Sequence, residues 1–290
     1  MILVFGRSGQ VAQALKTHLA PHDVMFVGRQ DADFSNPQQC LTVLDRVRPR
    51  LVINAAAYTA VDRAETERDL CRQLNAITPI QIGDWCKKNE TPFIHFSSDY
   101  VFDGKGETPY KEESPFAPVN WYGATKAEAD RALLSLNAKI LILRVSWVYS
   151  STGSNFVKTI LRLAQNHDEL RIVSDQIGGP TSADDIAQSV LSFLPQLSQF
   201  QNWGAYHYQG RPWCSWSSFA AEILFQAQKW DDGLSNKRVV EIRTVDFPTA
   251  AKRPANSRLD TTKFERVFGQ KVPDWKFSLQ SCLKEIYANP

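Results

Sequence analysis

The sequence predicts an α/β protein built on a doubly wound parallel sheet of the Rossmann type. Short apolar runs alternate with longer amphipathic stretches, which is typical of strands buried on both faces between helices. Right-handed crossovers bring the carboxyl ends of such strands to one edge, where ligands bind. The expected strands are Ile2–Phe5, Val24–Val27, Leu51–Asn54, Pro92–Phe96, Ile140–Leu143, Arg171–Val173 and Ala205–Tyr208.

Helical patterns fill the intervals between these strands, and the alternation becomes less regular after about residue 145. We expect a dinucleotide-binding domain over residues 1–150, to which residues 180–212 return. Residues 151–179 and 213–290 then form a smaller, mainly C-terminal substrate-binding region. The expected helices are Gln10–His18, Gln38–Val47, Asp69–Lys88, Tyr122–Leu136, Asn155–Gln165, Asp184–Leu197 and Ser218–Gln228.

The composition is that of an ordinary globular protein. Of 290 residues, 43% are hydrophobic and 22% are charged, and the net charge is only +2, so we expect neither a disordered chain nor a nucleic-acid-binding protein. No apolar run reaches the ~20 residues of a membrane span, and no signal-peptide pattern precedes the first strand. The five cysteines show no metal-ligand spacing. These features predict a soluble, cytoplasmic protein with no metal site and no membrane partner.

A glycine-containing loop joins the first strand to the first helix. Gly6 and Gly9 let the backbone turn tightly and approach a pyrophosphate, whose negative charge is favoured at a helix N-terminus. The spacing is Gly-x-x-Gly rather than the more common Gly-x-Gly-x-x-Gly, and a simple strand-to-helix turn is the alternative interpretation.

The residue that follows the second strand indicates which nicotinamide cofactor is preferred. NAD sites usually place an acid here to bind the ribose 2′-hydroxyl, whereas this chain has Arg29. An arginine can pair with the 2′-phosphate of NADP, and Arg7 in the glycine loop could add to that pairing. The prediction is NADPH, with acceptance of NADH left open. Both arginines could instead be solvated surface residues.

A tyrosine and a lysine lie four residues apart on one face of a predicted helix. An ammonium near the phenol of Tyr122 would lower its pKa from about 10, and Lys126 has the right spacing for that. Ser98 lies just past a predicted strand, where a hydroxyl can bind a substrate carbonyl. In isolation, the pair could be an ordinary helix surface and Ser98 a turn residue. Together the three residues are candidate catalytic groups.

The combination of motifs resembles the extended short-chain dehydrogenase/reductase superfamily and, within it, the dTDP-4-dehydrorhamnose reductase family. The resemblance covers nearly the whole chain, from Leu3 to about Leu283. Besides the glycine loop and Tyr122-x-x-x-Lys126, it rests on the segments Asn54–Glu65, Ser97–Phe102, Arg144–Tyr149, Asn155-Phe156, Asp175–Thr181 and Arg253–Leu259.

The resemblance implies reduction of dTDP-4-dehydro-6-deoxy-L-mannose to dTDP-L-rhamnose. Tyr122 would donate a proton to the C4 oxygen, Lys126 would tune Tyr122 and hold the nicotinamide ribose, and Ser98 would bind the substrate oxygen. The other implied contacts are Gln10 and Val11 at the pyrophosphate, Asp33 and Phe34 at the adenine side, Ala55, Ala56 and Tyr58 along the cofactor, and Val61, Tyr100 and Trp147 on the sugar. For Asp33 the alternative is a capping residue, and for Trp147 a core aromatic.

One departure from the family concerns its magnesium-bridged dimers, which use a glutamate just after the glycine loop. This chain has no carboxylate in that stretch, where Ala14 stands, although Asp184 and Glu285 lie near the other ligand positions. A metal-bridged dimer is therefore not expected, and a homodimer of another kind is left open.

Two groups of alternative functions share the features described above. A nucleotide-sugar dehydratase needs an acid after Asp99, where this chain has Tyr100, and an epimerase usually has an acid where Arg29 stands. A reductase of another 4-keto nucleotide sugar stays open. So does a regulatory subunit of the same fold without catalysis, although the three candidate catalytic residues argue against it.

Overall fold

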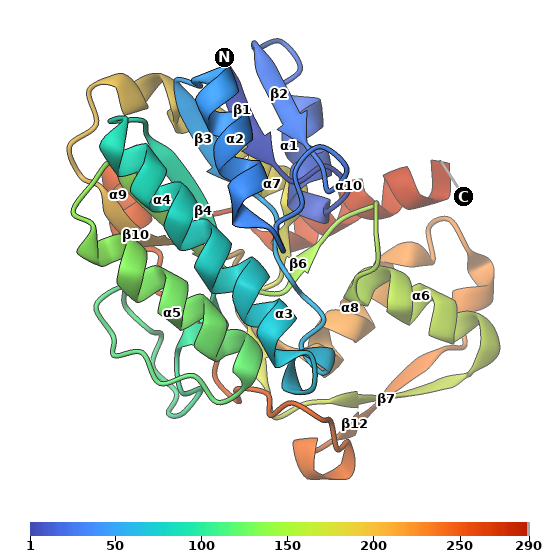
Figure 1. Ribbon diagram of the computed structural model, residues 1–290. Coiled ribbons are helices and arrows are strands. Elements are labelled where there is room, and N and C mark those ends of the chain that lie inside the picture. Colours follow the sequence, from blue (N-terminus) through green and yellow to red (C-terminus); the bar gives the residue numbers. More distant parts are fainter. Residues whose placement is uncertain (289–290) are drawn as a thin grey trace.

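The computed structural model describes residues 1–288 and has a six-stranded parallel sheet at its centre (Figure 1). All neighbouring strands run in the same direction, and the order β10-β5-β4-β3-β1-β2 reverses between β1 and β3. That reversal creates a crevice at the carboxyl ends of the strands. The strands are β1 (Ile2–Phe5), β2 (Val24–Val27), β3 (Leu51–Asn54), β4 (Phe93–Ser98), β5 (Ile140–Val145) and β10 (Gly204–His207).

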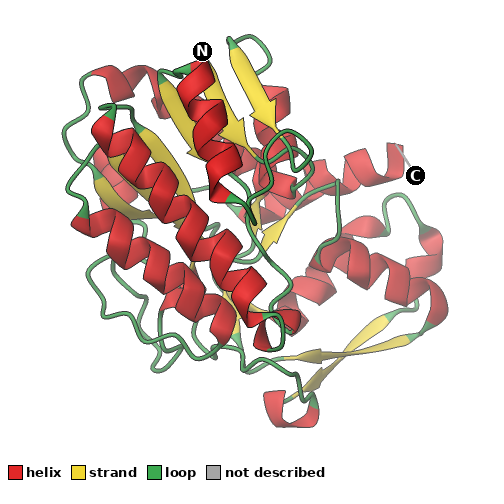
Figure 2. Ribbon diagram, in the orientation of Figure 1, coloured by secondary structure: helices red, strands yellow, loops and turns green. Residues whose placement is uncertain are grey.

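Helices cover both faces of this sheet, as Figure 2 shows. One face packs against α1 (Gln10–His18), α7 (Ala183–Phe193) and α9 (Thr262–Phe268). The other packs against α2 (Pro37–Val47), α4 (Thr78–Lys88) and α5 (Trp121–Ser135). The strands are almost wholly apolar because both of their faces are buried.

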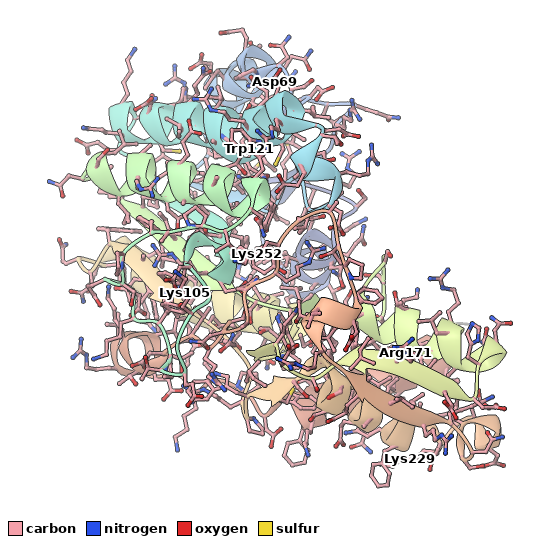
Figure 3. The ribbon with its side chains drawn as sticks, turned by 90° about the horizontal axis from the view of Figure 1, so that it is seen from below. Asp69, Lys105, Trp121, Arg171, Lys229 and Lys252 are labelled. Atoms are coloured by element: carbon pink, nitrogen blue, oxygen red, sulfur yellow. The ribbon has the colours of Figure 1, made fainter. Side chains whose placement is uncertain are left out.

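A second lobe has its own apolar core and projects from the body that carries the sheet. In Figure 3 the labelled residues Arg171 and Lys229 lie on this second lobe, whereas Asp69 and Trp121 lie on the main body. Its core lies among α6 (Phe156–Asn166), α8 (Trp216–Ala227) and α10 (Trp275–Ala288), beside the parallel pair β7 (Glu169–Val173) and β12 (Arg238–Ile242). Short two-residue pairs lie nearby: β6 (Val148–Tyr149) with β9 (Thr181–Ser182), and β8 (Ile177–Gly178) with β11 (Cys214–Ser215).

Several connections contain single turns of tighter helix. These are η1 (Arg63–Glu65), η3 (Asp99–Val101), η4 (Leu194–Ser198), η5 (Asp232–Leu234) and η6 (Thr244–Asp246). The last of them opens the long segment that leads back from the second lobe to the main body.

The predicted architecture is confirmed, with two corrections. The strand expected at Arg171–Val173 does form, but it pairs with β12 in the second lobe instead of joining the central sheet. The helix expected over Asp69–Lys88 is interrupted: α3 (Arg68–Arg72) is followed by the π-helical segment η2 (Gln73–Ile77) and then by α4. The division of the chain into two domains at the predicted residues stays a prediction.

Candidate active site

A cavity of about 700 Å³ opens at the carboxyl ends of β1, β2 and β3. It lies at the point where the strand order reverses, which is where open α/β sheets bind their ligands. Nine of the eleven residues predicted to contact a cofactor line this cavity: Gly6, Arg7, Gly9, Arg29, Asp33, Phe34, Ala55, Ala56 and Tyr58.

The glycine loop is shaped by a close approach between β1 and the end of β3. Gly6 has φ +111°, a conformation that L side chains rarely adopt, and a Cβ there would lie 3.0 Å from the Ala55 carbonyl carbon. Gly9 precedes α1 and supplies no side-chain cap. The first N–H groups of α1 therefore stay available to an anion.

Arg7 and Arg29 line the same cavity, and each is paired with a carboxylate. Arg7 lies 2.9 Å from Asp31, and Arg29 lies 3.2 Å from Asp33. The Arg29 side chain is 83% exposed. Exposed pairs of this kind contribute little to stability, so either guanidinium can exchange its partner for a phosphate.

The other predicted cofactor residues differ in their surroundings. Asp33 accepts from the Ser35 N–H, and this hydrogen bond lowers the pKa of its carboxyl. Phe34 is buried against Phe5 in an edge-to-face contact. The Tyr58 hydroxyl donates to Glu67 at 2.8 Å.

Gln10 and Val11 are the two predicted cofactor residues that do not line the cavity. The Gln10 side chain turns toward β6 and the residue after it: it donates to the Val148 carbonyl and accepts from the Ser150 hydroxyl. Val11 packs on the sheet. A contribution of these residues to pyrophosphate binding would therefore come from their backbone N–H groups in the first turn of α1, and it stays a prediction.

The catalytic candidates meet where α5 passes the end of β4. Asn120 caps α5 by accepting from the Gly123 N–H at 2.8 Å. A Cβ at Gly123 would lie 2.2 Å from the Tyr100 carbonyl oxygen, so glycine alone allows this approach. As a result the Tyr122 ring lies against Tyr100, with ring centroids 5.7 Å apart.

The structure brings Ser98, Tyr122 and Lys126 together. The Ser98 hydroxyl lies close enough to the Tyr122 phenol to favour its ionised form. Ser98 Oγ also donates to Asp99 Oδ1 at 2.9 Å. Lys126 is buried, and its Nζ donates to the Phe96 carbonyl at 2.8 Å. Ser98 is the last residue of β4 itself, whereas the sequence placed it just beyond the strand.

Burial shifts the pKa values of these groups. It raises the pKa of Tyr122, with the nearby Ser98 hydroxyl opposing the rise, and it lowers the pKa of Lys126 to about 8. It also raises the pKa of Asp99 to about 6. The expectation of a lowered Tyr122 pKa is therefore wrong for this structure, because desolvation of the phenolate dominates. Tyr122 is a neutral phenol near pH 7 and is suited to donate a proton.

The three predicted sugar-binding residues come from different parts of the site. Tyr100 packs on Tyr122, and Val61 is half-buried in the loop after β3. Trp147 stacks on Trp216 of the second lobe, with ring centroids 3.5 Å apart. Its φ of +47° is unusual for a bulky residue. Trp147 thus combines a strained backbone with core packing.

Asn75 is a site residue that the sequence did not reveal. It lies in the π-helical segment η2 and is fully buried. Its side chain accepts from the Tyr58 N–H at 2.8 Å and donates to the Tyr58 carbonyl at 3.0 Å. The same amide lies 3.3 Å from the Thr125 hydroxyl on α5. Asn75 therefore joins the wall of the cavity to α5, which carries Tyr122 and Lys126.

The segment that leads back from the second lobe contacts this region through an ion pair and a hydrogen bond. Arg253 pairs with Asp62 at 2.7 Å, and Asn120 donates to the Lys252 carbonyl at 2.8 Å. In Figure 3 Lys252 lies on the main body, between Trp121 and the second lobe. The N-cap residue of α5 is thus hydrogen-bonded directly to this segment.

The expected magnesium positions line a second cavity of about 400 Å³, apart from the first one. Ala14, Asp184 and Glu285 contribute to its wall, and Asp184 is paired with His18 at 2.6 Å. Within residues 1–288 no three potential metal-ligating side chains gather into a group.

In the same range no helix is long and apolar enough to cross a membrane.

Comparison with known proteins decides the family. The model of the RmlD substrate binding domain matches residues 1–288. The chain belongs to this family. Among curated relatives, the dTDP-4-dehydrorhamnose reductase of Shigella flexneri is 37% identical, covering 99% of this chain and 98% of the relative. That of Aggregatibacter actinomycetemcomitans is 39% identical with the same coverage.

Solved structures agree with this membership. A dTDP-4-dehydrorhamnose reductase from Clostridium acetobutylicum has a TM-score of 0.90 and 35% identity, covering 98% of both chains. The enzyme from Bacillus anthracis, solved in complex with NADP, has a TM-score of 0.87 and 32% identity with the same coverage. A dTDP-glucose 4,6-dehydratase of Bacillus anthracis shares the fold at 15% identity and a TM-score of 0.78.

Proposed function

We propose that this chain is an NADPH-dependent oxidoreductase that reduces the C4 keto group of dTDP-4-dehydro-6-deoxy-L-mannose to give dTDP-L-rhamnose. The observation that carries the proposal is the convergence of Ser98 at the end of β4 with Tyr122 and the buried Lys126 on α5, in a chain that the family model matches almost from end to end. A chain without catalytic function would have no chemical need to keep these three groups together.

The residues of the larger cavity fit a dinucleotide. Gly6 leaves the space that a Cβ would fill, and the uncapped N-terminus of α1 presents N–H groups to a pyrophosphate. Arg7 and Arg29 would hold the 2′-phosphate, which supports NADPH over NADH. The relative from Bacillus anthracis carries NADP. When bound, NADPH supplies the hydride that reduces C4.

The chain's own residues supply the proton and hold the keto group. Tyr122, a neutral phenol at pH 7, donates its proton to the C4 oxygen, and Ser98 binds the same oxygen. Lys126 then stabilises the phenolate that Tyr122 leaves. Val61, Tyr100 and Trp147 would contact the sugar.

The assignments that go with this function are proposed on the same basis. Residues 1–150 and 180–212 would bind the cofactor, and residues 151–179 and 213–290 the nucleotide sugar. All five cysteines are free thiols, which is consistent with a cytoplasmic location.

The test is a direct assay of purified protein with dTDP-4-dehydro-6-deoxy-L-mannose, following loss of NADPH absorbance and identifying the product by chromatography. We expect stoichiometric formation of dTDP-L-rhamnose, with slower turnover on NADH. A parallel panel of other 4-keto nucleotide sugars separates substrate choice from function. Turnover of another panel member alone would reassign the substrate, and no turnover of any member would favour a regulatory subunit.

A further inference from the structure

A fully buried ion pair lies behind the catalytic residues. Arg144 on β5 donates from Nε to Asp130 Oδ2 on α5 at 2.7 Å, and both side chains are 0% exposed. Burying two charges is costly unless each is well compensated. A residue pair of this kind is therefore expected either to hold the fold together or to act on a neighbouring charge.

Each member of this pair has one buried polar atom that is left without a hydrogen-bond partner in the part of the chain that the structure describes. Arg144 Nη1 donates to the Glu112 carbonyl at 3.1 Å, and its guanidinium lies over the rings of Phe102 and Phe116 at 5.3 and 4.9 Å. The second oxygen of Asp130, Oδ1, has no hydrogen-bond partner in the part of the chain that the structure describes. Arg144 Nη1 also lies 3.3 Å from Nε2 of His207 on β10, an imidazole whose pKa burial holds well below its usual value, while Arg144 Nη2 has no hydrogen-bond partner within residues 1–288. Arg144 thus has additional neutral partners, while half of the Asp130 carboxylate is not used by the pair.

Asp130 lies one helical turn after Lys126, which itself lies one turn after Tyr122. Residues at this spacing are neighbours on one helix face, with Cβ atoms ~5–6 Å apart. Lys126 Nζ donates only to a neutral group, the Phe96 carbonyl. The catalytic lysine is thus buried without a direct ion pair among residues 1–288, with Asp130 as the adjacent carboxylate.

The other titratable groups around Lys126 are neutral near pH 7. Cys71 faces it from α3, and burial raises the pKa of that thiol. His95 faces it from β4, and burial holds the pKa of the imidazole well below its usual value. Burial lowers the pKa of Lys126 to about 8, and Asp130 is the main group that opposes this shift. Arg144 on β5 places a positive charge next to Asp130, with which it is paired.

We propose that Asp130 is a positioning residue for the reaction: its carboxylate keeps Lys126 in the ammonium form, and Arg144 limits this effect by sharing the same carboxylate. The inference rests on the proposed reductase function, because Lys126 is a catalytic residue only in that reaction. The effect on the charge of Lys126 involves only Asp130, Lys126 and Arg144.

The test compares two variants that break the same ion pair from opposite sides. If the pair only holds the fold together, Asp130→Asn and Arg144→Gln should do similar damage. If it controls Lys126, they should have opposite effects. Asp130→Asn should lower the pH at which Lys126 loses its proton by about one unit, and Arg144→Gln should raise it by a smaller amount. Asp130→Glu is the matched control and should stay close to the wild type.

Two readouts keep this inference separate from the proposed function. NMR titration of ¹³C-labelled lysine, with the Lys126 signal assigned by its loss in Lys126→Arg, requires no substrate. The alkaline limb of the kcat/KM profile should move in parallel, because it reports groups of the free enzyme. Shifts by NMR without any turnover would refute the proposed function alone. Lys126 shifts of the same sign in both variants, or none in either, would refute this inference.

A double variant guards against failure of the single variants to fold. Asp130→Asn combined with Arg144→Gln leaves no unpaired buried charge, so it avoids the main cost of each single change. Because Lys126 loses a nearer negative charge and a farther positive one, its titration should still move to lower pH, by less than with Asp130→Asn alone. An unshifted Lys126 in the folded double variant would overturn the proposal.

Discussion

The wall of the larger cavity and the catalytic face of α5 both carry paired charges, but they hold them in opposite environments. At the cavity, the Arg29 and Asp33 side chains are 83% and 28% exposed. Between α5 and β5, the Arg144 and Asp130 side chains are wholly buried. The first pair is surrounded by water, which screens it, whereas the second is surrounded by protein.

This difference in solvation suits two different tasks. A binding surface needs charges that can exchange one partner for another when a ligand arrives, and an exposed ion pair loses little in that exchange. A proton-transfer site needs charges that do not move, because their effect on a neighbouring pKa depends on distance and on low screening. We therefore expect variants at the cavity to change affinity modestly and variants on α5 to change chemistry strongly.

The largest effect is expected at Tyr122 on the catalytic face. Tyr122→Phe removes the proposed proton donor and keeps the ring that packs on Tyr100, so the protein should fold normally. General acid catalysis contributes ~10²–10⁴-fold, and kcat should fall by that factor while NADPH affinity is retained. Steady-state kinetics and NADPH titration measure both.

Tyr206→Phe is the matched control, because Tyr206 lies on the edge strand β10 and its hydroxyl donates to the Asn202 carbonyl, outside both the cavity and the group of catalytic candidates. It should leave turnover near the wild-type value. A loss of less than tenfold for Tyr122→Phe would show that another group donates the proton.

The second prediction concerns Asn75, which joins the two regions. Asn75→Ala leaves the N–H and carbonyl of Tyr58 without partners, at a cost of about 1–3 kcal/mol for each group that stays buried. Because the same amide reaches Thr125, both NADPH affinity and kcat should fall. Chemical denaturation and kinetics on one variant measure the three quantities.

Asn89→Ala, at the C-terminal end of α4, is the comparison. It removes an asparagine that contacts neither region, so it should affect stability alone. If Asn75→Ala also changes only stability, the two regions are not coupled through this side chain.

The sequence predicted local features of the site better than contacts between distant segments. The bounds of β1, β2, β3 and α1 are as predicted, because each is a short, regular apolar pattern that ends in a turn. The i,i+4 spacing placed Tyr122 and Lys126 on one helix face, and the end of β4 brought Ser98 to them.

Contacts that depend on tertiary packing were not predictable in this way. The π-helical turn at Asn75 forms where the side chain reaches Tyr58, and the periodicity of residues 69–88 contains no sign of it. The Asp130–Arg144 pair requires α5 to lie over β5 in a particular register. The partner of β7 could not be predicted either, because β12 lies far away in the sequence and only its last residue, Ile242, is buried.

The third prediction tests the cavity wall at Arg29. Arg29→Ala should raise KM for NADPH about tenfold, since a charge-assisted phosphate contact is worth ~1.5–3 kcal/mol and this side chain is highly exposed. KM for NADH, which lacks the phosphate, should change little. Arg48→Ala, an exposed arginine paired with Asp45, is the control and should alter neither constant. Equal changes for both cofactors would mean that Arg29 does not contact the 2′-phosphate.

The smallest effect is expected at Asp31, the carboxylate that pairs with Arg7 in the same cavity wall. Asp31→Asn removes a negative charge that competes with the 2′-phosphate for Arg7. It retains an oxygen that can accept from the Gly28 N–H, as the carboxylate does at 2.8 Å, so the loop should keep its shape. Exposed charge pairs are worth ~0.2–1 kcal/mol, and KM for NADPH should therefore fall only about two- to fivefold. Because the charges are exposed, the gain should shrink as salt is added, and the constant for NADH should stay unchanged. A gain that persists at high salt, or that is equal for both cofactors, would mean that Asp31 acts through the shape of the loop rather than through its charge.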